Sequence, residues 1–361
     1  MWKKILLTIL LVVVAIVGGG YWFMGLVEKH PDTSALKVTT PAQVEYLNQQ
    51  VNTQRGRILM VVTSTDKLGD TGKSTGYELT ELSRAYYIFQ VNGFAADIAS
   101  PLGGKPPVII DKDDMGELDY AFLNDAEAQH KVRHSLLLSE VNPDDYAAVY
   151  FVGGKGAMFD FPDNHAIQTL VQKYYEQDKV IGAVCHGPAA LVNVKLRNGQ
   201  PLLKGKEVVS FTNAEELFLI AEAAEIFPFM LESKLTEQGA TFKGGPNYLE
   251  QVVADNKLIT GQNPWSVWSI ADAMVKALGH NPVERQADKQ EYAVKLLQIY
   301  HDFGFDMAQT ELTQMLNSGT QYPDRNLLLM HGIVGAMEWD LAKTVDLTRL
   351  ASQVKSWQEN R

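Results

Sequence analysis

The sequence contains one cysteine among 361 residues, so no internal disulfide can form and the fold must be held by its core. No spaced set of cysteine and histidine residues matches a structural zinc site. Positive charge is also scarce, because the chain has 32 lysines and arginines but 43 aspartates and glutamates, which gives a formal net charge of −11. This balance argues against a nucleic-acid partner, which requires a basic surface. The length and the 46% of hydrophobic residues suit a globular chain with one large and one smaller domain.

Charge is absent from a long stretch near the N-terminus. Two lysines are followed by no charged residue from Ile5 to Val27, and about 20 apolar residues are enough to span a bilayer as a helix. The apolar run continues past Gly18–Gly20, a weak cleavage site, so we expect a single-pass transmembrane anchor rather than a cleaved signal peptide. The lysines favour a cytoplasmic N-terminus. The rest of the chain would then lie on the periplasmic or extracytoplasmic side, and would be secreted or periplasmic if the segment were cleaved.

Beyond residue 55, apolar runs alternate with amphipathic segments. This alternation is typical of an α/β protein, and continuous apolar runs are typical of parallel strands that are covered on both faces. We therefore predict a doubly wound, flavodoxin-like, mostly parallel sheet with helices on both faces. The expected strands cover residues 58–63, 94–100, 147–154, 179–184 and 206–211, and the expected helices cover 78–91, 164–177, 186–193 and 213–221. A hairpin over 252–261 and a helix over 263–279 complete the domain.

These patterns divide the chain into four segments. We expect an anchor or signal over residues 1–30, a linker over 31–54, an α/β catalytic domain over 55–280, and a linker with an all-helical extension over 281–361. The extension should hold about four helices within 288–358, with breaks near Gly304, 319–324 and 340–345. Its two histidines, His301 and His331, are expected to be surface or core residues rather than metal ligands.

The lone cysteine lies in the stretch "VIGAVCHGPAA". An apolar strand that ends at Cys185 and is followed by Gly187 and a helix has the outline of a nucleophile elbow. A helix N-terminus beneath the sulfur predicts a lowered thiol pKa. A second turn, "VGGKGAMFDFPDN", follows another strand, and the backbone N–H groups of glycines such as Gly153 and Gly154 could stabilise an oxyanion.

Five segments together resemble the ThiJ/PfpI superfamily, which is class I glutamine amidotransferase-like, and within it the heat-shock, glutathione-independent glyoxalase branch. They read "GFAADIASPLGGKPP", "GGKGAMFDFPDN", "AVCHGPAAL", "LKGKEVVSFTNAEE" and "LITGQNP". The resemblance covers roughly residues 55–280, so the N-terminal segment and the helical tail lie outside it.

The resemblance implies a role for each matching residue. Cys185 would be the nucleophile and His186 the triad histidine, with Glu216 rather than Glu215 orienting the imidazole. Glu81, in "GYELTE", would be the acid/base; without the resemblance, it and the nearby Glu78 would be taken for solvated charges on a helix face. The N–H groups of Gly154 and His186 would form the oxyanion pocket, next to Gly153. One departure is Lys155, which stands where the family often has histidine and would alter the preference for substrate charge.

The resemblance implies neither a cofactor nor a metal. Some bacterial relatives have a site of two histidines and a carboxylate, for which the sequence offers no match. The available histidines, His130, His134 and His165, are expected at surface helix positions.

The function implied is a cofactor-free, cysteine-dependent glyoxalase III, or related deglycase, that acts in methylglyoxal detoxification. It would convert small 2-oxoaldehydes to 2-hydroxy acids as a D-lactate dehydratase does. One alternative is a cysteine amidase or peptidase with a Cys-His-Glu triad, and another is a stress-response holdase chaperone. A homodimer is a further expectation, and the N-terminal segment predicts the membrane as a partner.

Overall fold

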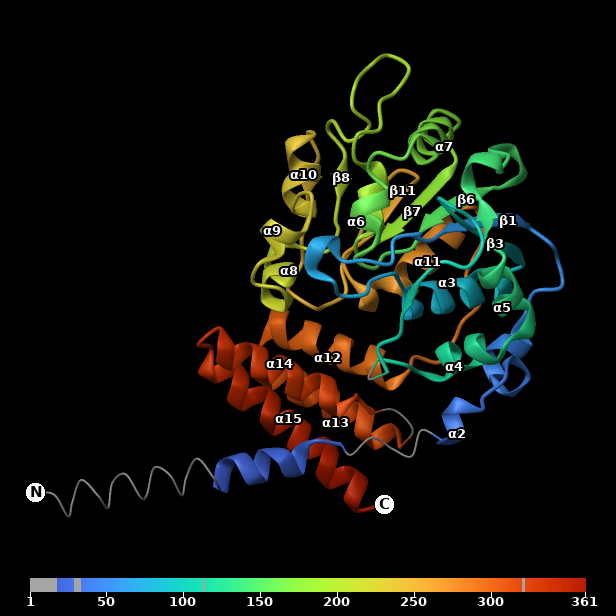
Figure 1. Ribbon diagram of the computed structural model, residues 1–361. Coiled ribbons are helices and arrows are strands. Elements are labelled where there is room, and N and C mark those ends of the chain that lie inside the picture. The colour runs from blue at the N-terminus through green and yellow to red at the C-terminus, as the bar shows by residue number, and fades with distance from the viewer. Residues whose placement is uncertain (1–17, 29–33, 113, 320–321) are drawn as a thin grey trace, which may run out of the picture. The chain divides into compact units, whose positions relative to one another are not determined.

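The computed structural model describes residues 18–28, 34–112, 114–319 and 322–361. The chain forms two compact units (Figure 1). Residues 34–286 form the α/β unit, and the described residues on either side of it in the sequence form a separate helical unit. Both ends of the α/β unit therefore lead into the same neighbouring unit.

The α/β unit is built on a seven-stranded sheet, which confirms the predicted mostly parallel α/β fold. Neighbouring strands of this sheet pair in parallel, except for the hairpin over 252–261, whose two strands are antiparallel. The order across the sheet is β10 (Val252–Asp255), β11 (Leu258–Gly261), β7 (Val180–Val184), β6 (Ala148–Phe151), β1 (Gly56–Val61), β3 (Phe94–Ser100) and β5 (Leu136–Leu137). The central strands β6 and β7 are buried along their length, and β1 is buried from Ile58 onward, as their continuous apolar runs predicted.

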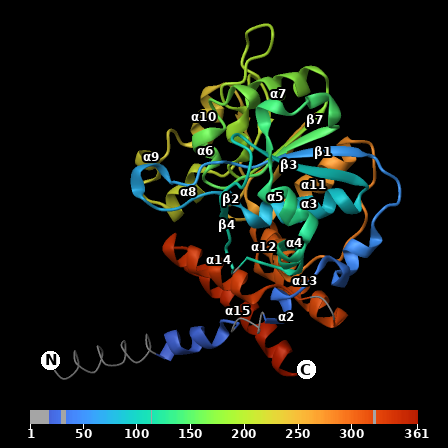
Figure 2. The ribbon, with the colours of Figure 1, turned by 45° about the vertical axis from the view of Figure 1, so that its right-hand side comes forward.

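Helices cover the sheet on both sides (Figures 1 and 2). α3 (Leu79–Val91) and α11 (Val267–Ala277) pack together on one face, and α7 (His165–Glu176) packs on the other. Gly182 in β7 faces α11, where a Cβ would stand 2.2 Å from the sulfur of Met274. Glycine at this position therefore allows the helix to approach the strand closely.

Shorter elements surround this core. They are α2 (Ser34–Lys37), α4 (Glu117–Asn124), α5 (Ala126–Arg133), α6 (Ala157–Asp160), α8 (Asn213–Leu219), α9 (Ala223–Ile226), α10 (Leu231–Glu237), and the strand pairs β2 (Tyr77–Glu78) with β4 (Val108–Ile109) and β8 (Glu207–Val208) with β9 (Thr241–Phe242). Single 3₁₀ turns are η1 (Pro41–Gln43), η2 (Glu45–Gln49), η3 (Gly69–Thr71), η4 (Leu138–Glu140), η5 (Pro143–Asp145), η6 (Gly187–Leu191) and η7 (Pro264–Ser266).

Two predicted elements differ from the structure. The run over 206–211 is not a strand of the main sheet, because only β8 is extended and paired, and Val209 then donates its N–H to the Thr260 side chain rather than to a backbone ladder. The helix expected over 186–193 is only η6, which ends where Val192 adopts an extended conformation.

The helical unit contains the four helices predicted for the C-terminal extension. They are α12 (Lys289–Phe303), α13 (Phe305–Ser318), α14 (Arg325–Met337) and α15 (Leu341–Glu359). Glycines with positive φ end α12 and α13, and aspartates at 288, 324 and 340 cap α12, α14 and α15 through hydrogen bonds from backbone N–H groups.

Residues 18–26 form a further helix of this unit. The Glu28 backbone forms two hydrogen bonds with the Asn326 side chain, of 2.8 Å and 3.1 Å. Among the described helices, none combines the length and hydropathy that crossing a membrane requires. Residues 5–17 of the predicted membrane span lie outside the described residues.

Candidate active site

Cys185 sits at a sharp turn directly after β7. Its φ of +58° lies in the left-handed region, which a residue with a side chain adopts only when its surroundings impose it. Here the Cys185 N–H donates to the Gly261 carbonyl, and the Cys185 carbonyl accepts from the Phe211 N–H. The next turn needs Gly187, because a Cβ there would stand 2.3 Å from the Phe151 carbonyl oxygen. The predicted elbow is therefore present, with its thiol at the carboxyl ends of the parallel strands.

The thiol, an imidazole and a carboxylate form a linear group. Cys185 Sγ lies 3.3 Å from His186 Nδ1, and His186 Nε2 lies 2.5 Å from Glu216 Oε2. All three side chains are buried, with the cysteine only 5% exposed. The imidazole packs against the rings of Phe211 and Phe227, with centroids 4.9 Å and 6.2 Å away, which fixes its plane. The structure thus brings together three of the residues that the sequence singled out.

The two adjacent glutamates of α8 have different surroundings. Glu215 accepts four hydrogen bonds, from the N–H groups of Thr212 and Tyr248 and from the side-chain amides of Gln262 and Asn263. Its carboxylate is therefore occupied in joining α8 to the loops beyond it. Burial acts to raise the pKa of Glu216, but the imidazole of His186 outweighs it and holds that pKa below its usual value. Glu216 is thus the carboxylate that faces the imidazole.

Glu81 meets the thiol from the opposite side, in the first turn of α3. It is fully buried, its Oε2 accepts a 2.8 Å hydrogen bond from the Gly153 N–H, and its negative charge acts to raise the pKa of the Cys185 thiol. The Tyr150 hydroxyl donates to the Glu81 carbonyl at 3.2 Å and so holds the start of the helix. A Cβ on Gly153 would lie 2.4 Å from Glu81 Oε2 and 2.8 Å from the Cys185 Cβ. Only glycine fits between the two side chains.

Burial is the main cause of the raised pKa values of Glu81 and the Cys185 thiol. It raises the pKa of Glu81 to about 8, although the nearby Cys185 thiol and the hydrogen bond from Gly153 act to lower it. Burial, followed by the negative charge of Glu81, also raises the pKa of the Cys185 thiol. The predicted lowering of the thiol pKa is therefore wrong, because the sulfur lies inside the protein beside a carboxyl. The helix expected to stabilise the thiolate is also only the five-residue turn η6. Two such groups in contact titrate as a pair, and one proton shared between them leaves one negative charge.

Lys155 supplies positive charge to this region. Its positive charge opposes the rise in the pKa values of Glu78, Glu81 and Cys185. It also contributes to the lowered pKa of Glu216. Lys155 therefore favours the negatively charged form of each of these groups, including the Cys185 thiolate.

Glu78 was missed as a member of the site. The interpretation of this residue as a solvated charge is wrong, because burial and the charge of Glu81 raise its pKa to about 9. Its N–H donates to the Gly153 carbonyl at 3.2 Å, which ties β2 to the glycine turn. The available signal was its position three residues before Glu81, at the start of the expected helix.

The backbone N–H groups of Gly153 and Gly154 in the glycine turn differ in their hydrogen bonding. The Gly153 N–H is engaged by Glu81, so it is not available to an oxyanion. Gly154, with φ +99°, has no room for a side chain, because a Cβ would stand 2.4 Å from the Gly76 carbonyl oxygen. Within the described ranges, neither the Gly154 nor the His186 N–H has a hydrogen-bond partner. These are the two donors that the resemblance assigned to the oxyanion pocket.

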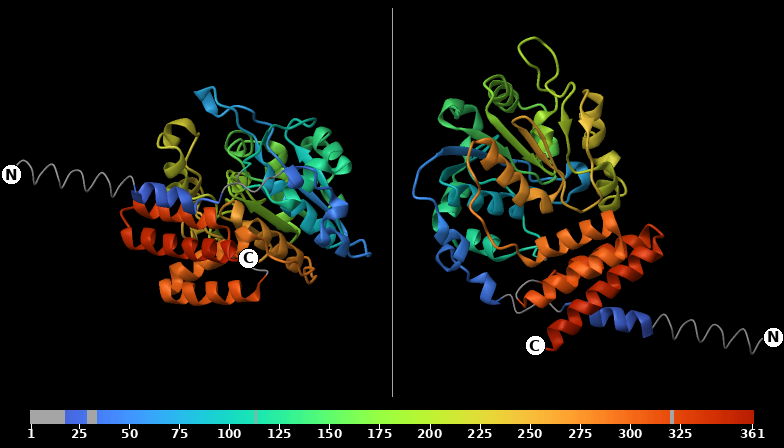
Figure 3. Two further views of the ribbon diagram at one scale, coloured as in Figure 1. Left: turned by 90° about the horizontal axis from the view of Figure 1, so that it is seen from below. Right: turned by 180° about the vertical axis from the view of Figure 1, so that it is seen from behind.

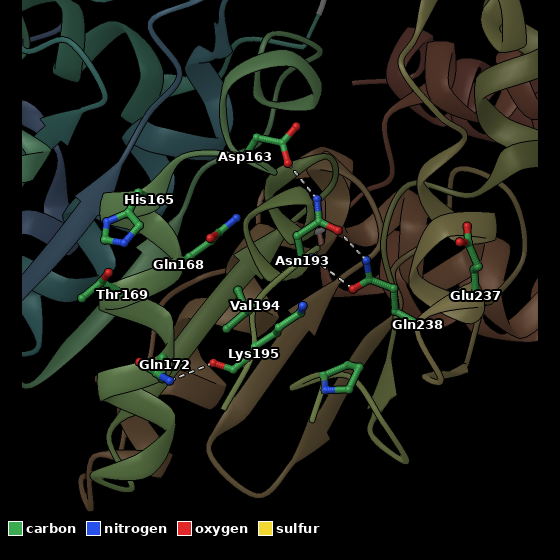
Figure 4. Close-up of a pocket in the computed structure, with 11 residues that line it drawn as sticks. Asp163, His165, Gln168, Thr169, Gln172, Asn193, Val194, Lys195, Glu237 and Gln238 are labelled. Atoms are coloured by element: carbon green, nitrogen blue, oxygen red, sulfur yellow. Dashed lines mark hydrogen bonds between the residues drawn. The ribbon is translucent and has the colours of Figure 1, made fainter. Parts of the chain in front are cut away.

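The cavities of the described α/β unit include two that bear on the site. One of about 450 Å³ is lined by Phe159 and Phe227, and the latter ring packs on His186. A larger one of about 610 Å³ contains none of the residues around Cys185. It includes His165, and Figure 4 shows Asn193 hydrogen-bonded to Asp163 and Gln238 on its wall. In the part of the chain that the structure describes, no three His, Cys, Asp or Glu side chains are grouped to hold a metal.

The elbow and its buried carboxylates place the chain in a broad class, the α/β proteins that present a cysteine at the carboxyl edge of a parallel sheet. Comparison with known families narrows the class, because residues 73–277 match the DJ-1/PfpI family. That match spans more than half of the chain, so the chain belongs to this family. The resemblance inferred from the five segments is confirmed.

Individual relatives cover the same part of the chain. The glutathione-independent glyoxalase hsp3101 of Schizosaccharomyces pombe is 31% identical over 232 residues, which are 61% of this chain and 95% of the relative. The crystal structure of the rapid encystment protein REP24 of Francisella tularensis is 38% identical, with a TM-score of 0.59 over 62% of this chain and 99% of that one. Glyoxalase III of Candida albicans is 26% identical, with a TM-score of 0.55 over 63% and 98% of the two chains.

Proposed function

We propose that this protein is a glutathione-independent glyoxalase that converts small 2-oxoaldehydes such as methylglyoxal to 2-hydroxy acids without a cofactor. The observation that supports it most directly is the buried contact between the Cys185 thiol and Glu81, a carboxyl whose pKa is raised to about 8. The names of its relatives point the same way, since hsp3101 and the Candida protein are glyoxalases.

The reaction begins when the Glu81 carboxylate takes the proton of the Cys185 thiol, which leaves the shared proton on Glu81 and the negative charge on sulfur. The Cys185 thiolate attacks the aldehyde carbon and forms a carbon–sulfur bond, while the carbonyl π bond breaks toward oxygen. The N–H groups of Gly154 and His186 stabilise that oxygen, and Glu81 gives it a proton to complete a hemithioacetal. Glu81 is then a carboxylate, directly beside the substrate carbon.

The second stage moves a proton between neighbouring carbons. The Glu81 carboxylate removes the proton from the former aldehyde carbon, giving an enediol, and returns it to the next carbon. The hydroxyl proton of the hemithioacetal passes to the former ketone oxygen, so the products are a thioester and a secondary alcohol. Water then cleaves the thioester, which releases the 2-hydroxy acid and restores the thiol. His186, held by Glu216 at 2.5 Å, is placed to activate that water. Hydrogen is redistributed within the substrate, so neither an oxidant nor a reductant is needed.

The test compares the purified protein with a Cys185→Ala variant in methylglyoxal without glutathione. The proposal predicts that the wild-type protein forms lactate and that the variant's rate falls to that of buffer. A variant that forms lactate at the wild-type rate would show that the thiol is not the nucleophile.

A second candidate function is supported by the triad itself. The distances of 3.3 Å and 2.5 Å along Cys185, His186 and Glu216 also suit a cysteine amidase or peptidase. Small amides, rather than proteins, would be its substrates, because the thiol is only 5% exposed. Hydrolysis of peptide amides that persists in a Glu81→Gln variant would favour this function, since the triad does not use Glu81.

We also propose that the α/β unit works on the extracytoplasmic side of a membrane, attached by the apolar N-terminal segment. Two N-terminal lysines followed by an uncharged run from Ile5 to Val27 support this orientation. In an oxidising compartment the lone cysteine has no second thiol in the chain to form a disulfide with, so oxidation would lead toward sulfinic acid.

A further inference from the structure

The exposed apolar side chains of the helical unit are concentrated at one end. We define the apolar edge as seven residues around the α12–α13 and α14–α15 turns that are between 47% and 88% exposed: Phe303, Met307, Ile333, Met337, Trp339, Leu341 and Val345. In α14 and α15 they come in pairs four residues apart, so each pair lies on one helix face. Trp339, at the tip, is 88% exposed and has a positive φ of +61°. Such a surface is unusual for a protein in contact with water alone.

The antiparallel arrangement of the four helices brings the two turns to the same end. The C-terminal end of α13 and the N-terminal end of α14 lie at the opposite end (Figures 1 and 3). The helix over residues 18–26 belongs to this unit and is held at its C-terminal end, where Glu28 is bonded to Asn326 and Leu26 is buried. In each view its N-terminal end points to the same side as the α14–α15 turn.

The N-terminal end of this helix and the apolar edge therefore lie on the same side of the helical unit. Tyr21, Trp22 and Met24, on the helix over 18–26, are also exposed. Tryptophan and tyrosine at this position, next to a long uncharged run, are typical of the boundary between lipid and water. We propose that the apolar edge of the helical unit lies in the interface of the membrane into which the N-terminal segment inserts.

This contact would depend on apolar burial rather than on charge. The side chains near the two turns include Asp302, Asp306, Glu338 and Asp340, against His301 and Lys343, and Lys343 is paired with Glu338 at 3.4 Å. An acidic surround of this kind is repelled by anionic lipid. The occupant is therefore a zwitterionic lipid surface, and the C-terminal extension serves as a platform that holds the protein against it at a second place.

The test uses the full chain with Cys185→Ala, so that an introduced cysteine is the only thiol. Trp339→Cys places the polarity-sensitive fluorophore NBD on the apolar edge, and Asn360→Cys places it at the end of α15, near the opposite end of the same unit. The proteins are reconstituted in phosphatidylcholine vesicles with and without brominated acyl chains. We expect blue-shifted emission and several-fold stronger quenching by bromine at position 339 than at position 360, and no gain in quenching when anionic phosphatidylglycerol is added.

Three results would overturn the proposal. The first is water-like, unquenched emission at position 339 in protein that floats with the vesicles. The second is a blue shift that bromine does not quench and that disappears on dilution, which would mean that a second copy of the chain covers the edge. The third is stronger quenching with anionic lipid. Because the inference rests on the proposed attachment, flotation is scored separately: protein that does not float refutes the anchor, whereas floating protein with an unquenched probe refutes only the edge.

Discussion

Replacing Glu81 by glutamine should increase stability at alkaline pH while it removes activity. The folded-state pKa of Glu81 is raised to about 8, from an ordinary value of 4.5, mainly because the side chain is fully buried. Between these two values the folded state holds a proton that the unfolded state has lost. The stability that Glu81 contributes is therefore complete below pH 4.5 and is lost as the pH rises to about 8.

The size of this effect follows from the two pKa values. Each pH unit between them changes the free energy of unfolding by about 1.4 kcal/mol, so the whole interval amounts to roughly 5 kcal/mol at most. Glutamine has nearly the same shape and no titratable proton. The variant should therefore lack this pH dependence, and its stability relative to the wild-type protein should rise continuously between pH 5 and pH 8.

The assay is urea unfolding of both proteins at a series of pH values, with lactate formation from methylglyoxal measured in parallel. Other titrating groups contribute to both curves, so the difference between the curves isolates Glu81 and the groups coupled to it. Curves that stay parallel from pH 5 to pH 8 would refute the raised pKa, and with it the assignment of Glu81 as the residue that first gives and then takes a proton.

Three further predictions concern the neighbours of this pair. Glu216→Gln should lower kcat by about 100-fold or more with little change in Tm, whereas Glu215→Gln should mainly lower Tm, since that carboxylate accepts four hydrogen bonds; the reverse pattern would exchange their roles. Lys155→Met should raise the pKa of Cys185 and move the acid limb of the kcat/KM profile upward by up to about one pH unit, and an unmoved limb would contradict this. Gly153→Ala should abolish lactate formation and lower the free energy of unfolding in urea by about 1–3 kcal/mol, because the added methyl group would collide with Glu81 and Cys185. A variant that stays active would show that these side chains can move aside.

Much of the fold could be predicted because local chemistry and long-range packing agree. The strand before Cys185 is a continuous apolar run, and it became the buried β7. The four C-terminal helices end at glycines with positive φ or begin at capping aspartates, which are signals within a few residues of each boundary. The run over 206–211 was predicted as a strand from its two adjacent valines, but the Val209 N–H donates to the Thr260 side chain, and only the fold could reveal that.

The site was predictable in composition but not in its electrostatics. The resemblance singled out Glu216 over Glu215, yet the physical reason depends on residues 33 to 48 positions away that occupy the Glu215 carboxylate. The pKa of Cys185 was predicted with the wrong sign because a helix N-terminus can be expected from sequence, whereas complete burial beside Glu81 cannot. Glu78 escaped notice for the same reason, since a glutamate next to a helix start looks solvated until the surrounding chain covers it.

The central claim is that substrate becomes bonded to Cys185 and that Glu81 then moves its proton. Mass spectrometry of the protein after acid quenching in methylglyoxal tests this most directly. We predict a covalent adduct of one substrate molecule on the peptide that contains Cys185 in the wild-type protein, and less adduct in the Glu81→Gln variant, because Glu81 takes the thiol proton and gives it to the substrate oxygen when the bond to sulfur forms. Lactate formation by the wild-type protein with no adduct on that peptide, in either protein, would contradict the account.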